Sequence, residues 1–247
     1  MKRTGDFDAK RAIAAITKGT RQYAKASGRH ACAVGISGGV DSAAVCGILC
    51  KALGPKNVFA YHLPAGDFSH LADAGAVAEK FGCNFEVADL TGAVDAVAKI
   101  SKPADSVGRG NIASRLRMVF LYAKARDLNA LAAGTSNKSE ITLGYFTKFG
   151  DGGVDFEPIG ELYKMQVYAI AKELGVPKRI IGKPPTAGLW PGQTDESELG
   201  AKYAQIDQAL RELGAGKAAK SPIAKKLLAR MRKNSHKLCM PPSISIK

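Results

Sequence analysis

The chain has 247 residues, 46% of them hydrophobic, and a formal net charge of +14. This length and apolar content are sufficient for a substantial core, and we expect residues 1–247 to form a single domain. No apolar stretch is long enough to span a bilayer, and the mixed charged N-terminus has no signal segment, so we expect a cytoplasmic protein with no membrane partner.

The first predicted elements are a helix over residues 8–25 and a short apolar strand over residues 31–36. Glycine-rich residues 35–42 connect this strand to a second helix, rich in Ala, Val and Leu, that extends to residue 53. A glycine loop between a strand and a helix N-terminus favours an anion, because the backbone approaches closely and free N–H groups point at the ligand.

The sequence of this loop, Gly-Ile-Ser-Gly-Gly-Val-Asp-Ser, adds chemistry to the backbone geometry. Ser37 and Ser42 supply hydroxyl donors, whereas Asp41 is a carboxylate within a phosphate site and therefore implies a bridging cation. The spacing lacks the lysine of a Walker A loop. The alternative interpretation is a tight turn that merely begins a helix.

Further elements alternate between strand and helix. We expect strands over residues 57–63, 84–88 and 130–134, and helices over residues 71–81, 93–100 and 112–126. This order predicts an α/β fold with an open parallel sheet and helices on both faces. Residues 144–160 form a long loop of the kind that is often functional.

Residues 195–247 are expected to form a helical, basic C-terminal part. Ten Lys or Arg residues and one acid, Glu212, fall within residues 211–247. Such charge suits nucleic acid, a membrane surface or a polyanionic small ligand, and a solvated helix face is the plainer alternative. Since no aromatic residue follows Tyr203, we expect no nucleic-acid partner.

The cysteines include no Cys-x-x-Cys pair, so reduced and buried thiols are expected, with a metal or redox role as the alternative. The five positions are Cys32, Cys46, Cys50, Cys83 and Cys239.

Residues 37–42 resemble the Ser-Gly-Gly-x-Asp-Ser pyrophosphate loop of the ATP pyrophosphatase (PP-loop) superfamily, which implies an adenine-nucleotide alpha-hydrolase-like, Rossmann-like fold. Further runs extend the resemblance to ammonia-dependent NAD synthetase over nearly the whole chain. They are residues 111–118, 134–140, 144–155, 162–164, 185–190, 193–196 and 236–237. The stretch 63–69 departs from the family pattern, and we assign it no adenosine contact.

The resemblance implies a homodimeric ligase with ATP as cosubstrate and Mg²⁺ as cofactor. Its reaction is amidation of nicotinic acid adenine dinucleotide (deamido-NAD) with ammonia through an adenylated carboxylate, giving NAD, AMP and pyrophosphate. Free ammonia is the expected donor, unless a separate protein supplies it, because only 34 residues precede the loop and an amidase domain needs more.

The same resemblance implies individual roles for residues. Asp41 and Glu140 would ligate Mg²⁺, although Glu140 is also explained as a first-turn helix acid. The expected ATP-binding residues are Gly35, Ile36, Ser37, Gly38, Gly39, Val40, Asp41, Ser42, Thr135, Lys164 and Thr186. The expected deamido-NAD contacts are Arg115, Tyr145, Lys148, Asp155, His236 and Lys237.

Other assignments also have plain alternatives: Lys164 is also explained as a surface lysine, His236 as a surface histidine and Tyr145 as a core tyrosine. Asp151 is the expected catalytic residue, binding ammonium and accepting its proton, but an Asp-Gly-Gly turn explains it equally well. Arg115 and Arg117 lie on different faces of one predicted helix, and the resemblance favours Arg115 as the ligand contact.

Other members of the superfamily provide rival hypotheses. A purine-nucleotide amidating synthetase would share the phosphate loop but not the later runs. A tRNA-modifying enzyme would use the basic tail, but thiolating members need a pair of catalytic cysteines that this spacing does not provide.

Overall fold

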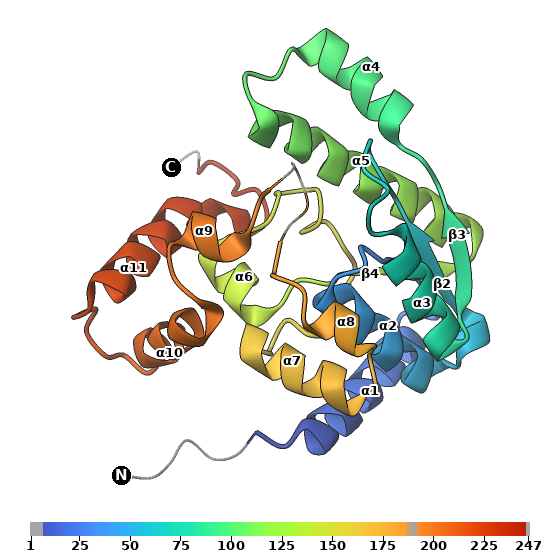
Figure 1. Ribbon diagram of the computed structural model, residues 1–247, viewed down its shortest axis with the longest axis horizontal. Coiled ribbons are helices and arrows are strands. Elements are labelled where there is room, and N and C mark those ends of the chain that lie inside the picture. Colours follow the sequence, from blue (N-terminus) through green and yellow to red (C-terminus); the bar gives the residue numbers. More distant parts are fainter. Residues whose placement is uncertain (1–6, 187, 189–191, 246–247) are drawn as a thin grey trace.

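The computed structural model describes residues 7–186, 188 and 192–245. Its centre is a sheet of four parallel strands in the order β3-β2-β1-β4 (Figure 1). The strands are β1 (Ala31–Gly35), β2 (Val58–His62), β3 (Asn84–Val87) and β4 (Ala130–Ala133). The predicted open parallel sheet is therefore confirmed, and each strand lies within two residues of its predicted bounds.

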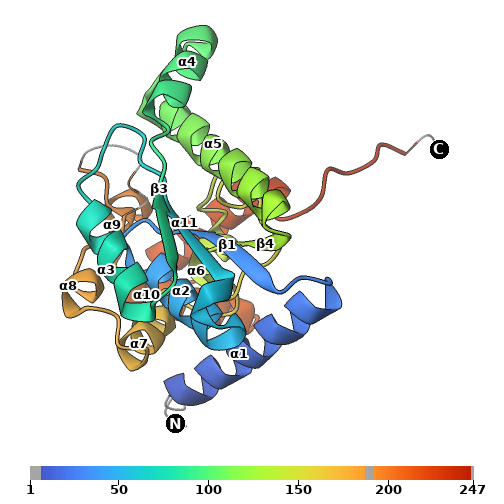
Figure 2. The same cartoon turned by 90° about the vertical axis from the view of Figure 1, so that its right-hand side faces the viewer.

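Helices cover both faces of the sheet, as Figure 2 shows for α2 and α5. Alternate residues of β1 make the division visible. Cys32 and Val34 belong to a core cluster that includes residues of α2, whereas Ala33 packs with Leu121 of α5 on the other face. The helices on the α2 face are α1 (Ala9–Ala26), α2 (Val40–Leu53), α3 (Leu71–Phe81) and α7 (Lys164–Glu173).

Helix α5 (Ser106–Asp127) begins six residues before its predicted start, because the Asp105 side chain caps it by accepting from the Gly108 N–H at 2.8 Å. Helix α4 (Thr91–Ser101) packs against α5. Arg117 of α5 is partly buried and donates to the Leu63 carbonyl at 2.9 Å. It therefore has a structural partner on the sheet side.

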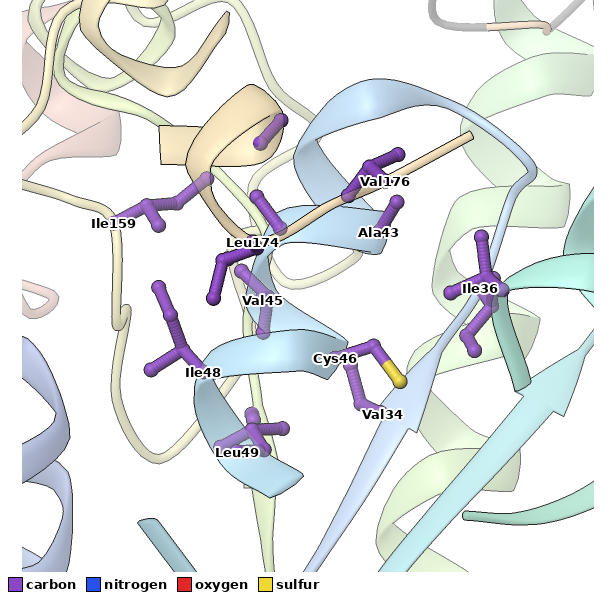
Figure 3. Packing of buried hydrophobic residues seen from close by; sticks show 14 of the residues in the cluster. Val34, Ile36, Ala43, Val45, Cys46, Ile48, Leu49, Ile159, Leu174 and Val176 are labelled. Carbon is purple, nitrogen blue, oxygen red and sulfur yellow. The ribbon is translucent and has the colours of Figure 1, made fainter. Parts of the chain in front are cut away.

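The main core lies between the sheet and the helices on the α2 side. There Val34, Ile36, Val45, Ile48 and Ile159 pack together (Figure 3). Helix α2 is buried along almost all of its length. Burial of apolar surface stabilises the folded chain by about 25 cal/mol per Å². The many buried aliphatic side chains of α2 therefore hold it firmly on the sheet. The loop that precedes α2 is positioned with it.

The C-terminal part is helical, as expected, and has its own apolar cluster around Tyr203 and Leu227. The remaining helices, including two short 3₁₀ turns, are η1 (Pro55–Asn57), α6 (Lys138–Leu143), α8 (Lys178–Ile181), α9 (Asp195–Leu199), α10 (Tyr203–Gly214), α11 (Pro222–Asn234) and η2 (Ser235–Lys237). Among the described residues, no helix combines the length and apolar character needed to cross a membrane.

The chain order places a crevice between β1 and β4. From β1 the chain moves outward through β2 to β3 and then returns to β4 on the other side. Ligands bind outside the carboxyl ends of parallel strands where the order reverses in this way. The loops after β1 and β4 meet at this point.

The expectation of uniformly buried thiols is wrong for three cysteines. Cys239 is exposed, and Cys50 and Cys83 are only partly buried. All five are free thiols.

Candidate active site

The phosphate loop is preorganised by its own hydroxyls and glycines. Ser42 Oγ accepts a hydrogen bond from the Ser37 N–H at 3.2 Å. It also lies 3.1 Å from Ser37 Oγ. Gly38 has φ of +79°, and a Cβ there would stand 2.9 Å from the His70 carbonyl oxygen. Gly39, the N-cap of α2, provides no side-chain cap, so the first-turn N–H groups of the helix remain available to an anion.

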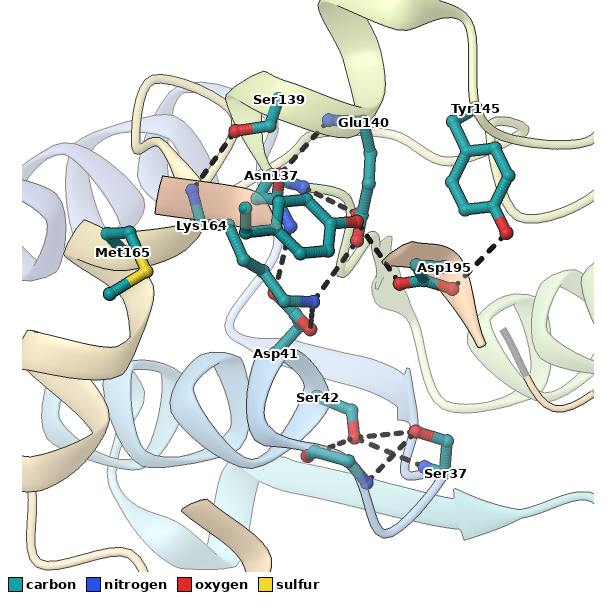
Figure 4. Close-up of polar contacts among 12 residues, drawn as sticks. Ser37, Asp41, Ser42, Asn137, Ser139, Glu140, Tyr145, Lys164, Met165 and Asp195 are labelled. Atoms are coloured by element: carbon teal, nitrogen blue, oxygen red, sulfur yellow. Dashed lines mark hydrogen bonds and ion pairs between the residues drawn. The ribbon is translucent and has the colours of Figure 1, made fainter. Parts of the chain in front are cut away.

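A carboxylate pair meets one lysine beside this loop. Lys164 Nζ lies 2.5 Å from Asp41 Oδ2 and 3.3 Å from Glu140 Oε1, and its side chain is only 2% exposed. Asn137 Nδ2 donates to the other oxygen of Asp41 at 3.0 Å. Figure 4 shows these side chains converging from α2, α6 and α7.

Local structure explains how Glu140 is held. Asn137 caps α6 by accepting from the Glu140 N–H at 3.1 Å, and Glu140 Oε2 accepts from the Asn137 N–H at 3.1 Å. The first-turn interpretation of Glu140 is thus confirmed. Its second oxygen, Oε1, still points to Lys164, so the capping role leaves one carboxylate oxygen for a cation.

Burial dominates the electrostatics of this group. Burial raises the pKa of Glu140 to about 8, although the Lys164 ammonium opposes the rise. Burial also disfavours the charged form of Lys164, but attraction to Asp41 and Glu140 outweighs it and raises the pKa of the lysine. The position of the Lys164 ammonium, between the Asp41 and Glu140 carboxylates, is therefore one that attracts cations strongly.

Hard oxygen donors fit Mg²⁺. Asp41 and Glu140 each direct one oxygen at the same cationic nitrogen, so the two carboxylates already share one cation position. Mg²⁺ usually takes one or two carboxylates together with substrate phosphates and water. The residues present therefore fit a magnesium ion placed between them and the phosphate loop.

Asp195 is a second buried acid on the C-terminal side of this group, and burial raises its pKa. It accepts from the Tyr203 hydroxyl at 3.1 Å and from the Tyr145 hydroxyl at 3.2 Å. Asp195 lies within residues 193–196, which carry part of the family resemblance, but the sequence alone predicted no role for it. The Tyr145 hydroxyl therefore contacts Asp195. The Arg230 guanidinium carbon lies 5.1 Å from the centre of the Tyr145 ring.

Four of the expected deamido-NAD residues form a second group that is rich in cations, namely Arg115, Lys148, His236 and Lys237. Arg115 Nε donates to the Lys148 carbonyl at 3.3 Å, and Lys148 Nζ donates to the His236 carbonyl at 2.5 Å. Lys237 Nζ donates to the Gly144 and Phe146 carbonyls. Burial and the nearby Arg230 lower the pKa of Lys237. Arg115, and not Arg117, joins this group.

Asp151 lies in the loop between these groups. Its Oδ1 accepts from Ser114 Oγ at 2.7 Å and from the Thr147 N–H at 2.9 Å. The Asp151 N–H donates back to Ser114 Oγ at 2.9 Å. These bonds give Asp151 a turn-forming role and anchor the loop to α5.

Three expected residues lie apart from these contacts. Asp155 accepts from the Ala132 N–H on β4 at 2.8 Å and from the Tyr122 hydroxyl at 3.1 Å. Thr135 follows β4 by two residues, at the crevice. Thr186 is exposed, and its hydroxyl accepts from the Gly188 N–H at 3.0 Å.

Glu157 is a functional candidate that sequence reasoning missed. It accepts from the Ser136 N–H at 3.0 Å, and burial raises its pKa to about 8. The absence of a side chain at Gly134 leaves room for Glu157, because any Cβ at that position would overlap the Glu157 carboxylate. The only signal was the acid content of loop 144–160.

Known proteins resemble the chain along nearly its whole length. The family model described as NAD synthase matches residues 12–241. The chain is 40% identical over 230 residues to the NH(3)-dependent NAD(+) synthetase of Archaeoglobus fulgidus, covering 92% of this chain and 93% of that protein. It is 45% identical over 207 residues to the Pyrococcus horikoshii protein of the same name, covering 83% and 80%.

Solved structures agree with these matches. The structure of NMN synthetase from Francisella tularensis has a TM-score of 0.89 at 32% identity and covers 98% of this chain and 100% of its own. The NH3-dependent NAD synthetase from Campylobacter jejuni has a TM-score of 0.84 at 32% identity, with coverage of 97% and 100%.

Proposed function

Because the chain belongs to the NAD synthase family and has NH3-dependent NAD synthetase activity, we propose that its site amidates deamido-NAD through an adenylated carboxylate. The observation that carries this proposal is the convergence of Asp41 and Glu140 on one cation position beside the phosphate loop. Little covalent chemistry is asked of such a site; it positions two anions and neutralises developing charge.

Loop residues 35–42 would bind the β- and γ-phosphates of ATP, with the Ser37 and Ser42 hydroxyls and the first N–H groups of α2 as donors. Thr135, Lys164 and Thr186 complete the proposed ATP contacts. When the nicotinate carboxylate oxygen attacks the α-phosphorus, the electron pair of the broken P–O bond leaves with pyrophosphate. The loop then holds the leaving group.

Asp41 and Glu140 would hold Mg²⁺. The ion, when bound, supplies charge neutralisation at the phosphate oxygens. Lys164 Nζ lies at the position that the two carboxylates share. Its long, flexible side chain would let the ammonium turn toward phosphate and leave the two carboxylates to the metal.

The basic group would receive deamido-NAD. Arg115, Lys148 and Lys237 bring three positive charges to one loop, which suits the pyrophosphate and carboxylate of a dinucleotide acid. The Tyr145 ring would contact the pyridine. His236 and Asp155 are the remaining proposed contacts.

The second half-reaction requires ammonia at the adenylated carboxyl carbon. Asp151 would bind ammonium and take one proton, so that neutral ammonia attacks and the carbonyl–oxygen bond to AMP breaks. The fixed hydrogen bonds of Asp151 to Ser114 and Thr147 support this role, because they occupy Oδ1 and hold Oδ2 in a constant direction.

A homodimer is the proposed assembly. Val119 and Tyr122 on α5 are 56% and 36% exposed, and Phe149, in the loop that contains Asp151, is 52% exposed. An apolar surface of this kind is typical of a protein interface. Asp155 bonds to Tyr122 on the same side, which links one proposed substrate residue to this surface.

Nicotinic acid mononucleotide is the second candidate acceptor. The observation that favours it is the TM-score of 0.89 with a structure described as an NMN synthetase, over the full length of that chain. Both acceptors present the same nicotinate carboxylate to the phosphate loop, so they differ only in the adenylate half that the basic group would contact.

One experiment separates these acceptors. The purified chain is incubated with ATP, Mg²⁺ and ammonium, together with deamido-NAD, nicotinic acid mononucleotide, xanthylate or tRNA. The proposal is supported if AMP, pyrophosphate and NAD form with deamido-NAD and the kcat/KM for deamido-NAD is the largest among the acceptors. A larger kcat/KM for the mononucleotide supports the second candidate. AMP formation with only xanthylate or tRNA overturns both. The mass in solution, measured on the same sample, tests the dimer.

A further inference from the structure

Three cysteine thiols meet where α2 packs against the end of α3. Cys46 and Cys50 lie one turn apart on α2, and Cys83 follows the C-cap of α3. Their Sγ atoms all lie within 4.8 Å of one another. The approach depends on Gly47, because a Cβ there would stand 2.7 Å from the Phe81 ring that closes α3 against α2.

The separations suit a shared ion better than a disulfide. Cys46 Sγ and Cys83 Sγ are 3.6 Å apart, whereas a disulfide needs about 2.05 Å. An ion about 2.3 Å from each of two sulfurs at a tetrahedral angle holds them about 3.8 Å apart. Small side-chain rotations are therefore enough to bring all three thiols onto one ion.

Access and packing differ within the cluster. Cys46 is completely buried, while Cys50 and Cys83 are partly exposed. The other two cysteines lie outside the cluster: Cys32 is buried in β1, and Cys239 is exposed near the C-terminus. They provide natural comparisons within the same chain.

The surrounding backbone favours a cation. Cys50 lies in the last turn of α2, and Cys83 lies immediately beyond the end of α3, so the negative ends of two helix dipoles face the cluster. The thiolate is the form that binds metal, so each cysteine gives up its thiol proton when it becomes a ligand.

From this geometry we propose that Cys46, Cys50 and Cys83 form a binding site for one thiophilic metal ion of the zinc type. Thiolate ligands select soft ions and exclude Mg²⁺, so the site is independent of the Asp41–Glu140 pair and of the proposed function. Binding forms three metal–sulfur bonds and releases the thiol protons to solvent. The ion would fasten α3 to the helix whose first turn carries the phosphate loop.

Cadmium titration of the full-length, reduced and metal-free chain tests this site. We expect one Cd²⁺ per chain, a thiolate-to-cadmium charge-transfer band, proton release, and displacement of the band by excess Zn²⁺. Cys50→Ser and Cys83→Ser should abolish the band, whereas Cys239→Ser should leave it unchanged. Thiol counting before each titration shows that the cysteines are reduced.

Melting temperature provides a second readout that does not depend on the band. Zn²⁺ should raise the melting temperature of the wild type and of Cys239→Ser but not of Cys50→Ser, because only a folded site gains from binding. If a serine variant fails to fold, Cys50→Ala and Cys83→Ala replace it. A fully reduced wild type without a cadmium band, or a band that survives in the Cys50 and Cys83 variants, overturns the proposal.

Discussion

Asn137 donates from Nδ2 to Asp41 Oδ1 over 3.0 Å, across 96 positions of sequence. The contact exists because β1 and β4 are neighbours and their loops meet at the crevice. Asn137 serves both sides of that crevice, since its amide oxygen caps α6 while its amide nitrogen orients the Asp41 carboxylate. One side chain thus couples the position of the phosphate loop to that of Glu140.

This double role predicts that two substitutions will separate capping from orientation. Asn137→Ser keeps an oxygen suited to the N-cap but loses the amide that reaches Asp41. We expect turnover to fall roughly 10–100-fold in both Asn137→Ser and Asn137→Ala, as for other residues that orient metal ligands. Both variants lose the hydrogen bond to Asp41, and the alanine variant should lose about 1 kcal/mol more of unfolding free energy because it also loses the helix cap.

Steady-state NAD formation and urea unfolding of the three proteins provide the comparison. Wild-type turnover in Asn137→Ser would show that Asp41 is oriented without Asn137.

A second prediction concerns the buried ion pair. Asp41→Asn should abolish Mg²⁺-dependent turnover and lower stability by about 1.5–3 kcal/mol, because a charged hydrogen bond to Lys164 is lost. Lys164→Met should also destabilise, since Asp41 and Glu140 then face each other without a cation. The double variant should recover part of the stability and none of the activity.

Urea unfolding in a double-mutant cycle gives the coupling free energy, which we expect at about 0.5–3 kcal/mol. The surface pair Lys138 and Glu161, 2.9 Å apart with Glu161 93% exposed, is a matched control whose coupling should be about 0–1 kcal/mol. Equal coupling in the two pairs would mean that burial adds nothing to the Asp41–Lys164 interaction.

The sequence predicted those parts of the site whose residues lie in one local pattern. The glycine loop and Asp41 follow β1 directly, and Thr135 and Glu140 follow β4, so strand order alone brings them to one edge of the sheet. Helix ends were harder to predict when one polar side chain sets them. Asp105 illustrates this, because its cap starts α5 earlier than the apolar pattern does.

Residues whose positions depend on tertiary packing could not be predicted in the same way. Asp195 reaches the site through a short helix that packs with Tyr203, and Glu157 enters from a loop through the space that Gly134 leaves. The cysteine cluster is similar, since Cys83 meets Cys46 only when α3 lies against α2. In each case an acid or a thiol is unremarkable until a distant segment buries it.

A third prediction uses the buried acid Glu157, whose pKa rises from 4.5 to about 8 in the folded chain because of burial. The folded state therefore binds more protons than the unfolded state between these values, so stability falls as pH rises. The stabilising contribution is complete below pH 4.5 and is lost as pH approaches 8.

Glu157→Gln should remove that dependence, because glutamine stays neutral. Unfolding free energies measured between pH 5.5 and 7.5 in urea should decline in the wild type by up to about 1.4 kcal/mol per pH unit relative to the variant. Identical slopes in the two proteins would place the folded-state pKa of Glu157 below this window.

The last prediction distinguishes the two interpretations of Asp151. Asp151→Asn keeps an oxygen for the Ser114 hydroxyl and the Thr147 N–H, so the loop should hold and the unfolding midpoint should change little. If the carboxylate accepts the ammonium proton, kcat at neutral pH should fall about 10²–10⁴-fold. Part of the rate should return as pH rises, because more of the donor is then present as free ammonia and needs no base. Ser114→Ala, which removes both hydrogen bonds between Ser114 and Asp151 and keeps the carboxylate, should show a smaller loss without this recovery. An Asp151→Asn variant with the wild-type rate and pH profile would leave Asp151 with only its turn-forming role.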